Sequence, residues 1–226
     1  MRAPKVVIFD VNETLLDIEA VGPVFADLFG DGRVLREWFA QLLVYSMSAT
    51  LAGQYVDFFT LGRGVLHMVG AVHGVAIGDD DWRRVSEAFR SMPAHPDVED
   101  GLTRLRDHGY RLVTLTNSPP VSGAPTPLET AGLDRYVERQ FSVDTYGTFK
   151  PARALYVDVA AELEVAPQDC MMVAAHIWDT MGAQSAGMQS AFLARPGNAL
   201  IPTLPQPTIT AADVLELARL LGAVRP

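Results

Sequence analysis

A short apolar run near the start of the chain, residues 6–9, ends directly on a carboxylate, Asp10. Its β-branched and aromatic side chains predict a buried strand, because short runs of this kind bounded by polar residues are typical of sheet cores. A carboxylate at the carboxyl end of such a strand stands where open α/β sheets place their chemistry. An Asp after a strand is also common in a turn or a helix cap, so this run alone leaves both interpretations open.

The second half of the chain alternates between strand-like and helix-like segments. Besides residues 6–9, we predict strands over 111–115, 141–143, 170–174 and 191–194. Helical patterns cover 97–108, 125–132, 151–164, 179–187 and 211–221. We expect Pro151 in the first turn of its helix, and a last helix that starts near Thr208 or Thr210 and stops at Gly222. Strands separated by helices predict an α/β fold with a Rossmann-like parallel sheet covered on both faces.

The region from 17 to 95 differs, because it shows helical periodicity and little strand signal. It stands between the first and second predicted strands, so it emerges above the carboxyl edge of the sheet and can cover Asp10. We predict a helical cap domain over 17–95 and a core made of 1–16 and 96–226. Proline residues at 93 and 96 mark the return to the core.

Polar residues stand at or just after four predicted strand ends: Asp10, the pair Thr116 and Asn117, Lys150, and Asp179. The carboxyl ends of parallel strands share one edge of a sheet, so we expect these residues to converge. Two carboxylates, an ammonium, and hydroxyl and amide donors form a plausible nucleophilic site. Singly, each has an ordinary explanation: a solvated lysine, a turn, or a helix cap.

Four segments resemble the motifs of the haloacid dehalogenase superfamily, and most closely those of its type II haloacid dehalogenases. They are residues 9–15, residues 114–118, residues 149–151 with Tyr156, and residues 173–179 followed by Gly182-Ala183. The Trp-Asp pair at 178–179 with a following Gly-Ala is quite specific to this group. The resemblance spans nearly the full length and implies a Rossmann-like core, an inserted helical cap and a homodimer.

The resemblance also implies an activity, the hydrolytic dehalogenation of small 2-haloalkanoic acids through an ester on Asp10. In that scheme Lys150 keeps Asp10 ionised, Thr14 hydrogen-bonds the carboxylate or its loop, and Asp179 orients the hydrolytic water. Tyr156 is expected to hold Lys150 or Asp179 in position as a neighbouring residue. The residues expected at the substrate site are Asn12, Thr116, Asn117, Trp38, Phe39, Tyr156, His176 and Trp178, of which Thr116 and Asn117 would hold the substrate carboxylate.

Most members of the superfamily are Mg²⁺-dependent phosphotransferases, which carry an acidic general acid two residues after the nucleophile and an acidic metal ligand in the fourth motif. Here these positions are Asn12 and the pair Ala174-Ala175. An amide cannot protonate a leaving group, and two carboxylates beside a lysine give Mg²⁺ too few oxygen ligands. We therefore expect no metal and no cofactor. We expect the Glu13 side chain to point away from Asp10, so that it does not replace the acid.

Two departures from the type II pattern leave the substrate open. Those enzymes carry an Arg on the first cap helix, and the matching position here is Phe39, beside Trp38, with Arg36 three residues earlier. A Ser and an Asn of the fourth motif are Ala174 and His176, and His176 either donates near the leaving group or bonds the backbone as a structural residue. The alternatives are another small carbon electrophile such as a strained ring, a phosphatase with a degenerate acid, and a non-catalytic scaffold.

The bulk composition narrows the remaining classes. The 226 residues carry a formal net charge of −9, which argues against a nucleic-acid or anionic-membrane surface. We find no apolar run long enough to span a membrane. One cysteine, Cys170, excludes an internal disulfide, so we expect a cytoplasmic protein. The partner that the resemblance implies is a small halocarboxylate.

Overall fold

The computed structural model describes residues 2–223, so residue 1 and residues 224–226 of the predicted core lie outside the described residues. A parallel sheet forms its centre, with the strand order β3-β2-β1-β4-β5-β6. The strands are β1 (Val6–Phe9), β2 (Arg111–Thr116), β3 (Arg139–Ser142), β4 (Cys170–Ala174), β5 (Gln189–Leu193) and β6 (Ile209–Ala211). The predicted α/β fold with a parallel sheet is confirmed.

The first strand lies in the middle of this sheet. Phe9 pairs with Thr114 of β2 on one side and with Val173 of β4 on the other. All four residues of β1 are buried, because a central parallel strand is covered on both faces and on both edges. The next residue, Asp10, donates its backbone N–H to the Val173 carbonyl at 3.0 Å, so its side chain starts between two neighbouring strand ends.

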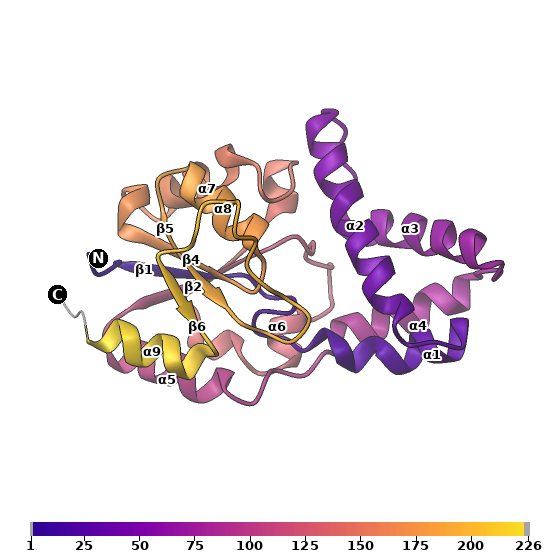
Figure 1. Ribbon diagram of the computed structural model, residues 1–226, viewed down its shortest axis with the longest axis horizontal. Coiled ribbons are helices and arrows are strands. Elements are labelled where there is room, and N and C mark those ends of the chain that lie inside the picture. The colour runs from indigo at the N-terminus through magenta and orange to yellow at the C-terminus, as the bar shows by residue number, and fades with distance from the viewer. Residues whose placement is uncertain (1, 224–226) are drawn as a thin grey trace.

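Helices cover both faces of the sheet (Figure 1). On one face lie α5 (Val98–Asp107) and α9 (Val214–Gly222), and on the other α7 (Arg153–Glu162) and α8 (Ile177–Ser185). The remaining short elements are α6 (Pro127–Thr130) and the 3-10 turns η1 (Ile18–Val21), η2 (Asp134–Tyr136), η3 (Val143–Tyr146) and η4 (Pro167–Asp169).

Three local predictions were wrong. The segment 209–211 forms a sixth strand, so the last helix begins at Val214 and not near Thr208 or Thr210. Its N-cap is Asp213, whose carboxylate accepts the Glu216 N–H. Pro151 precedes α7 instead of lying in its first turn, and its bond to Lys150 is cis. The helix expected over 125–132 is reduced to the four residues of α6.

A second group of helices lies beside the carboxyl ends of the strands (Figure 1). This helical lobe consists of α1 (Gly22–Phe29), α2 (Val34–Leu51), α3 (Phe58–His73) and α4 (Asp79–Arg90). The two connections to the core run side by side, because Leu16 and Ala94 form an antiparallel bridge and the His95 N–H donates to the Leu15 carbonyl. The lobe is thereby held next to Asp10. The division at 16/17 and 95/96 stays a prediction.

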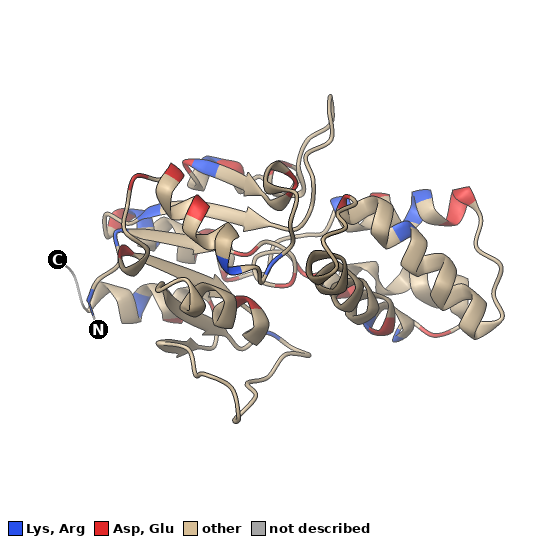
Figure 2. Cartoon of the chain, turned by 90° about the horizontal axis from the view of Figure 1, so that it is seen from above, with Lys and Arg blue, Asp and Glu red and all other residues tan. Residues whose placement is uncertain are grey.

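Charged residues of both signs are interspersed over the sheet core and the helical lobe (Figure 2). Among residues 2–223, none of the helices is both long enough and apolar enough to cross a bilayer.

Candidate active site

The predicted convergence of Asp10, Lys150 and Asp179 is observed at the carboxyl edge of the sheet. The Lys150 ammonium lies 2.7 Å from Asp10 Oδ1 and 2.7 Å from Asp179 Oδ2, and it also donates to the Leu115 carbonyl at 2.9 Å. All three side chains are buried, with Lys150 only 1% exposed. Two carboxylates that are brought together in a dry interior repel each other, so the ammonium between them is what allows them to be close.

The charges of this group are set by burial and by each other. Burial raises the pKa of Asp10, but the attraction of Lys150 and His176 outweighs it and holds that pKa well below its usual value. Burial lowers the pKa of Lys150, yet the two carboxylates raise it overall. Burial and the neighbouring Asp10 raise the pKa of Asp179. Asp10 is therefore an anion held beside a cation, the state that a carboxylate nucleophile needs.

Neighbouring residues fix the orientation of both carboxylates. The Thr14 hydroxyl donates to Asp10 Oδ2 at 2.7 Å and accepts the Ala175 N–H at 2.9 Å, as expected for a residue that holds the carboxylate. The Tyr156 hydroxyl donates to Asp179 Oδ1 at 2.6 Å. Gly182 makes room for this tyrosine, because a Cβ at that position would lie 2.7 Å from the Tyr156 ring. Both oxygens of Asp179 thus already accept a hydrogen bond.

His176 lies on the other side of Asp10. Its Nε2 is hydrogen-bonded to Glu13 Oε2 at 2.6 Å, and its Nδ1 lies 3.5 Å from Asp10 Oδ2. Among the described residues, Nδ1 has no hydrogen-bond partner. The imidazole stacks on the Trp178 ring, with centroids 4.9 Å apart. The alternative of a histidine bonded to the backbone is wrong, and Glu13, which was expected to point away from Asp10, is linked to it through this imidazole.

This pairing sets the protonation of both partners. Burial lowers the pKa of His176, but its contacts with Asp10 and Glu13 outweigh burial and raise it to about 9. Burial raises the pKa of Glu13, while His176 and Arg36 bring it below its usual value. At neutral pH the resting protein therefore holds a protonated imidazole against two ionised carboxylates.

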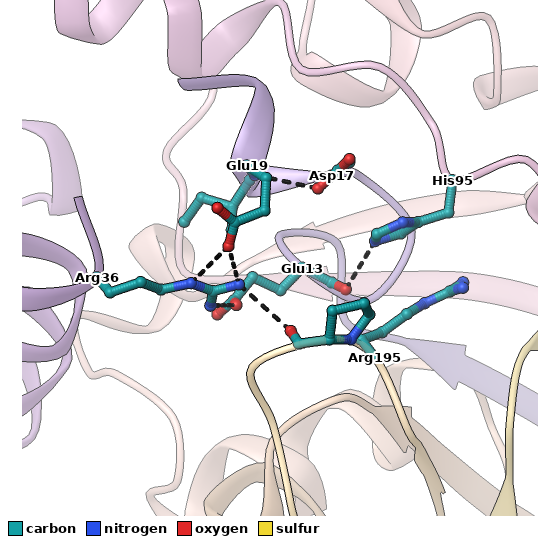
Figure 3. Close-up of a pocket in the computed structure, with 8 residues that line it drawn as sticks. Glu13, Asp17, Glu19, Arg36, His95 and Arg195 are labelled. Atoms are coloured by element: carbon teal, nitrogen blue, oxygen red, sulfur yellow. Dashed lines mark hydrogen bonds and ion pairs between the residues drawn. The ribbon is translucent and has the colours of Figure 1, made fainter. Parts of the chain in front are cut away.

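Arg36 extends from α2 of the helical lobe to the loop after β1 (Figure 3). Its guanidinium pairs with Glu13 and donates from Nε to Glu19 Oε1 at 2.7 Å. Its charge is therefore already balanced by two carboxylates, which leaves it poorly placed to replace the absent cap arginine as a free cation. Arg36 instead ties the helical lobe to the site.

The backbone of that loop is also held from the core side (Figure 3). His95 lies 3.1 Å from the Glu13 carbonyl, and Arg195 donates to the Thr14 carbonyl at 3.1 Å. Arg195 is itself fixed by a bidentate pair with Asp97. These contacts position Glu13, whose backbone has a φ of 64°, the left-handed region that residues other than glycine seldom adopt.

The predicted aromatic pair on α2 is split between two environments. Trp38 lies in the interior of the helical lobe, where its indole N–H donates to the Gly62 carbonyl at 3.0 Å. Phe39 instead lines a cavity of about 300 Å³ beside the charge cluster. The same cavity is lined by Leu43, His176, Trp178 and Asn198. The structure thus brings Phe39 to the site and leaves Trp38 out of it.

The remaining predicted residues stand at or just after the ends of β1 and β2. The Asn117 side-chain oxygen accepts the backbone N–H of Lys150 at 3.3 Å, and Asn12 donates to Ser118 Oγ at 3.2 Å. Thr116 accepts the Ser118 N–H and lines a second cavity of about 150 Å³. Asn117 therefore positions Lys150 through the backbone, while Thr116 stands at a separate opening.

The donor set at the strand ends does not fit a magnesium ion. The space between the carboxylates of Asp10 and Asp179 belongs to the Lys150 ammonium. Residues 174 and 175 are alanines, and across residues 2–223 no group of three or more His, Cys, Asp or Glu side chains has a metal-binding arrangement. A hard cation needs several oxygen ligands, so no step of the chemistry is derived through a metal.

Comparison with known proteins agrees with this geometry. Residues 4–187 match the haloacid dehalogenase-like hydrolase family. The (S)-2-haloacid dehalogenase 4A of Burkholderia cepacia is 28% identical over 193 residues, covering 84% of this chain and 83% of that protein. An (S)-2-haloacid dehalogenase of Xanthobacter autotrophicus is 27% identical, covering 96% and 85%. A crystal structure of a dehalogenase with an intermediate complex superposes with a TM-score of 0.87 at 25% identity, covering 98% of this chain and 99% of that one. The chain belongs to the haloacid dehalogenase-like hydrolases.

Proposed function

We propose that this hydrolase cleaves the carbon–halogen bond of small 2-haloalkanoic acids, without a metal, through an ester on Asp10. The observation that carries the proposal is the Lys150 ammonium, buried 2.7 Å from both Asp10 and Asp179. It keeps a buried carboxylate ionised at the strand end, which is a nucleophile that needs no bound metal ion. The names of the two curated relatives support 2-haloacids as the substrate class.

The first step is a substitution at carbon. One Asp10 oxygen forms a bond to the carbon that carries the halogen, and the halide leaves with the bonding electrons. A halide needs no proton, so the amide of Asn12 in the general-acid position is no obstacle. Loss of the negative charge on Asp10 leaves Lys150 paired with Asp179 alone.

The second step is hydrolysis of the ester by water at the Asp10 carbonyl carbon. We expected Asp179 to orient this water, but its two oxygens accept from Lys150 and Tyr156. We therefore assign Asp179 to positioning Lys150. The apolar wall formed by Phe39 and Trp178 limits the cavity beside His176 to a small substrate.

A halocarboxylate panel tests the proposal. We expect L-2-chloropropionate, chloroacetate or fluoroacetate to release halide, with the rate unchanged by EDTA. Asp10→Asn keeps the shape and removes the nucleophile, so activity should fall on the order of 10⁴-fold or more. Asp31→Asn, at an exposed ion pair, is the matched control. Metal-dependent phosphate release from p-nitrophenyl phosphate, with no halide from any haloacid, would overturn the proposal.

We also propose that the protein is a homodimer, as the resemblance implies. Light scattering after size-exclusion chromatography should give twice the mass of the chain, and a monomer across the working concentration range would refute it.

A further inference from the structure

The hydrolytic step lacks a base among the groups that the mechanism already uses. Lys150 donates to three acceptors, and both Asp179 oxygens are engaged. Next to Asp10, His176 Nδ1 is a buried polar atom that has no hydrogen-bond partner among residues 2–223. It lies 3.5 Å from Asp10 Oδ2, and the same side chain lines the cavity of about 300 Å³. His176 therefore lies beside the nucleophile and also lines a cavity that can hold water.

We propose that His176 is the general base that activates water against the Asp10 ester, with Glu13 as the residue that orients its ring. This inference rests on the proposed function, because it concerns the second half of the same reaction. The hydrogen bond to Glu13 engages Nε2, so the lone pair of a neutral ring lies on Nδ1, the nitrogen nearest Asp10.

Formation of the ester changes the charge balance that keeps His176 protonated. In the resting enzyme, the Asp10 and Glu13 carboxylates outweigh burial and raise the pKa of His176 to about 9. The ester removes the Asp10 charge and leaves Glu13 as the one carboxylate in contact with the ring. His176 is also the N-cap of α8, where the helix dipole disfavours a cation. The proton is then released towards the cavity of about 300 Å³ that the same side chain lines.

Other charged groups around the ring favour the same change. Lys150 stays next to the ester, and one carboxylate fewer then balances its positive charge. Arg36 pairs with Glu13 from α2 and weakens the pull of Glu13 on the imidazole proton. Asp179 is compensated by Lys150 and by the Tyr156 hydroxyl. The ester state therefore lowers the pKa of His176 towards neutrality, where a general base is effective.

The proposed proton movements balance over one cycle. Neutral His176 takes a proton from water as the water oxygen bonds to the Asp10 carbonyl carbon. The tetrahedral intermediate collapses, its bond to the substrate oxygen breaks, and the departing alkoxide takes the remaining hydroxyl proton as the 2-hydroxy acid. Asp10 is again a carboxylate and His176 is again protonated. The one proton released per turnover leaves when the ester forms, not when it is hydrolysed.

Glu13 is fixed in place by several contacts, as is required of a residue that orients the His176 ring. Its left-handed backbone is unfavourable for a residue with a Cβ, so other contacts must keep it in place. His95 and Arg195 bind the carbonyls of residues 13 and 14, and Arg36 binds the second carboxylate oxygen. The Glu13 oxygen that meets His176 is thereby fixed from the core and from the helical lobe.

The test separates ester formation from ester hydrolysis. His176→Gln keeps a side chain that can bond Glu13 but cannot accept a proton at neutral pH. We expect it to release about one halide per site and then to hydrolyse the ester ~10²–10³-fold more slowly, so that intact-protein mass spectrometry shows the adduct on Asp10. His73→Gln, at an exposed histidine–carboxylate pair with Glu37, is the matched control and should behave as wild type.

Two readouts exclude a merely structural effect. In wild type, a pH indicator in stopped flow should report proton release together with the halide burst, and in His176→Gln this early release should vanish. Glu13→Gln removes the charge that stabilises the imidazolium, so the acid limb of the ester-hydrolysis rate should move to lower pH. If His176→Gln does not fold, the shift of this acid limb in Glu13→Gln tests the role of His176 instead.

The outcomes distinguish the two proposals. Ester hydrolysis at the wild-type rate in His176→Gln, or an acid limb that does not move in Glu13→Gln, would overturn the role of His176 while leaving the dehalogenase intact. Absence of halide release from wild-type protein would overturn the proposed function itself.

Discussion

The buried charge cluster around Asp10 has two halves that are built differently. The Lys150 half, which joins Asp10 to Lys150, Asp179 and Tyr156, lies wholly within the sheet core. The His176 half, which joins Asp10 to His176, Glu13 and Arg36, extends across to α2 of the helical lobe, and the Arg36 side chain is 32% exposed. In the Lys150 half, one buried cation is paired with two buried carboxylates of the core. The His176 half contains a group that titrates near pH 9 in the resting protein, and it depends on the contact that Arg36 makes between the lobe and the core.

The largest loss of stability and activity is expected from a substitution that removes the cation of the Lys150 half. Lys150→Met leaves two buried carboxylates without their cation, so unfolding free energy should fall by about 3–5 kcal/mol. The pKa of Asp10 should rise, because Lys150 lowers it, and halide release should fall on the order of 10²–10³-fold.

The other lysine of the chain, Lys5, provides the control for this change. Its ammonium pairs with Asp169 at the surface, where the lysine is 61% exposed, so Lys5→Met should cost under about 1 kcal/mol. Urea unfolding measures both variants. Equal losses of stability would mean that the buried cation is not what holds the two carboxylates together.

The second largest effect is a difference between the two halves in how their contributions to stability depend on pH. The pKa of His176 is raised from 6.5 to about 9 in the folded protein, so its contribution is present below pH 6.5 and is lost as the pH rises through 9. The loss over this window is about 3 kcal/mol. Asp10, whose pKa is lowered, contributes stability that is lost only on acidification below its usual range.

The measurement is the difference in unfolding free energy between wild type and His176→Gln from pH 6 to pH 9. It should shrink steadily as the pH rises, because the variant lacks the titrating group. A constant difference would contradict a protonated imidazole in the resting protein.

A smaller effect is expected at the outer end of the His176 half. Arg36→Ala removes one cation from Glu13, but the arginine is partly solvated, so the loss of stability should be about 1–2 kcal/mol. Arg33→Ala, at a pair with Asp31 in which the arginine is 91% exposed, is the control and should change stability little. Thermal unfolding measures both, and an equal shift of Tm in the two variants would show that Arg36 does not tie the lobe to the core.

The Lys150 half could be predicted from the sequence for a physical reason. Asp10 directly follows a predicted strand, and Lys150 and Asp179 stand at the starts of the predicted helices that come after later strands. Parallel strands bring such positions to one edge of the sheet. The roles of Thr14 and Tyr156 were predicted from the family resemblance, and both side chains hydrogen-bond a carboxylate of this set.

The His176 half could not be predicted in this way. Glu13 and His176 are 163 residues apart, and no periodicity relates a loop after the first strand to the N-cap of a later helix. Trp38 was expected at the substrate, but its side chain is directed into the lobe while its neighbour Phe39 faces the core. The strand at 209–211 was missed because three residues carry too little pattern to distinguish a strand from the start of a helix.

A single turnover in H₂¹⁸O, with enzyme in excess over L-2-chloropropionate, tests the central claim most directly. Water is proposed to attack the Asp10 carbonyl, so the heavy oxygen should appear in the peptide that contains Asp10, and the hydroxy acid from this first turnover should be unlabelled. Heavy oxygen in the product, with an unlabelled Asp10 peptide, would show that water attacks the substrate carbon and that no ester forms on Asp10.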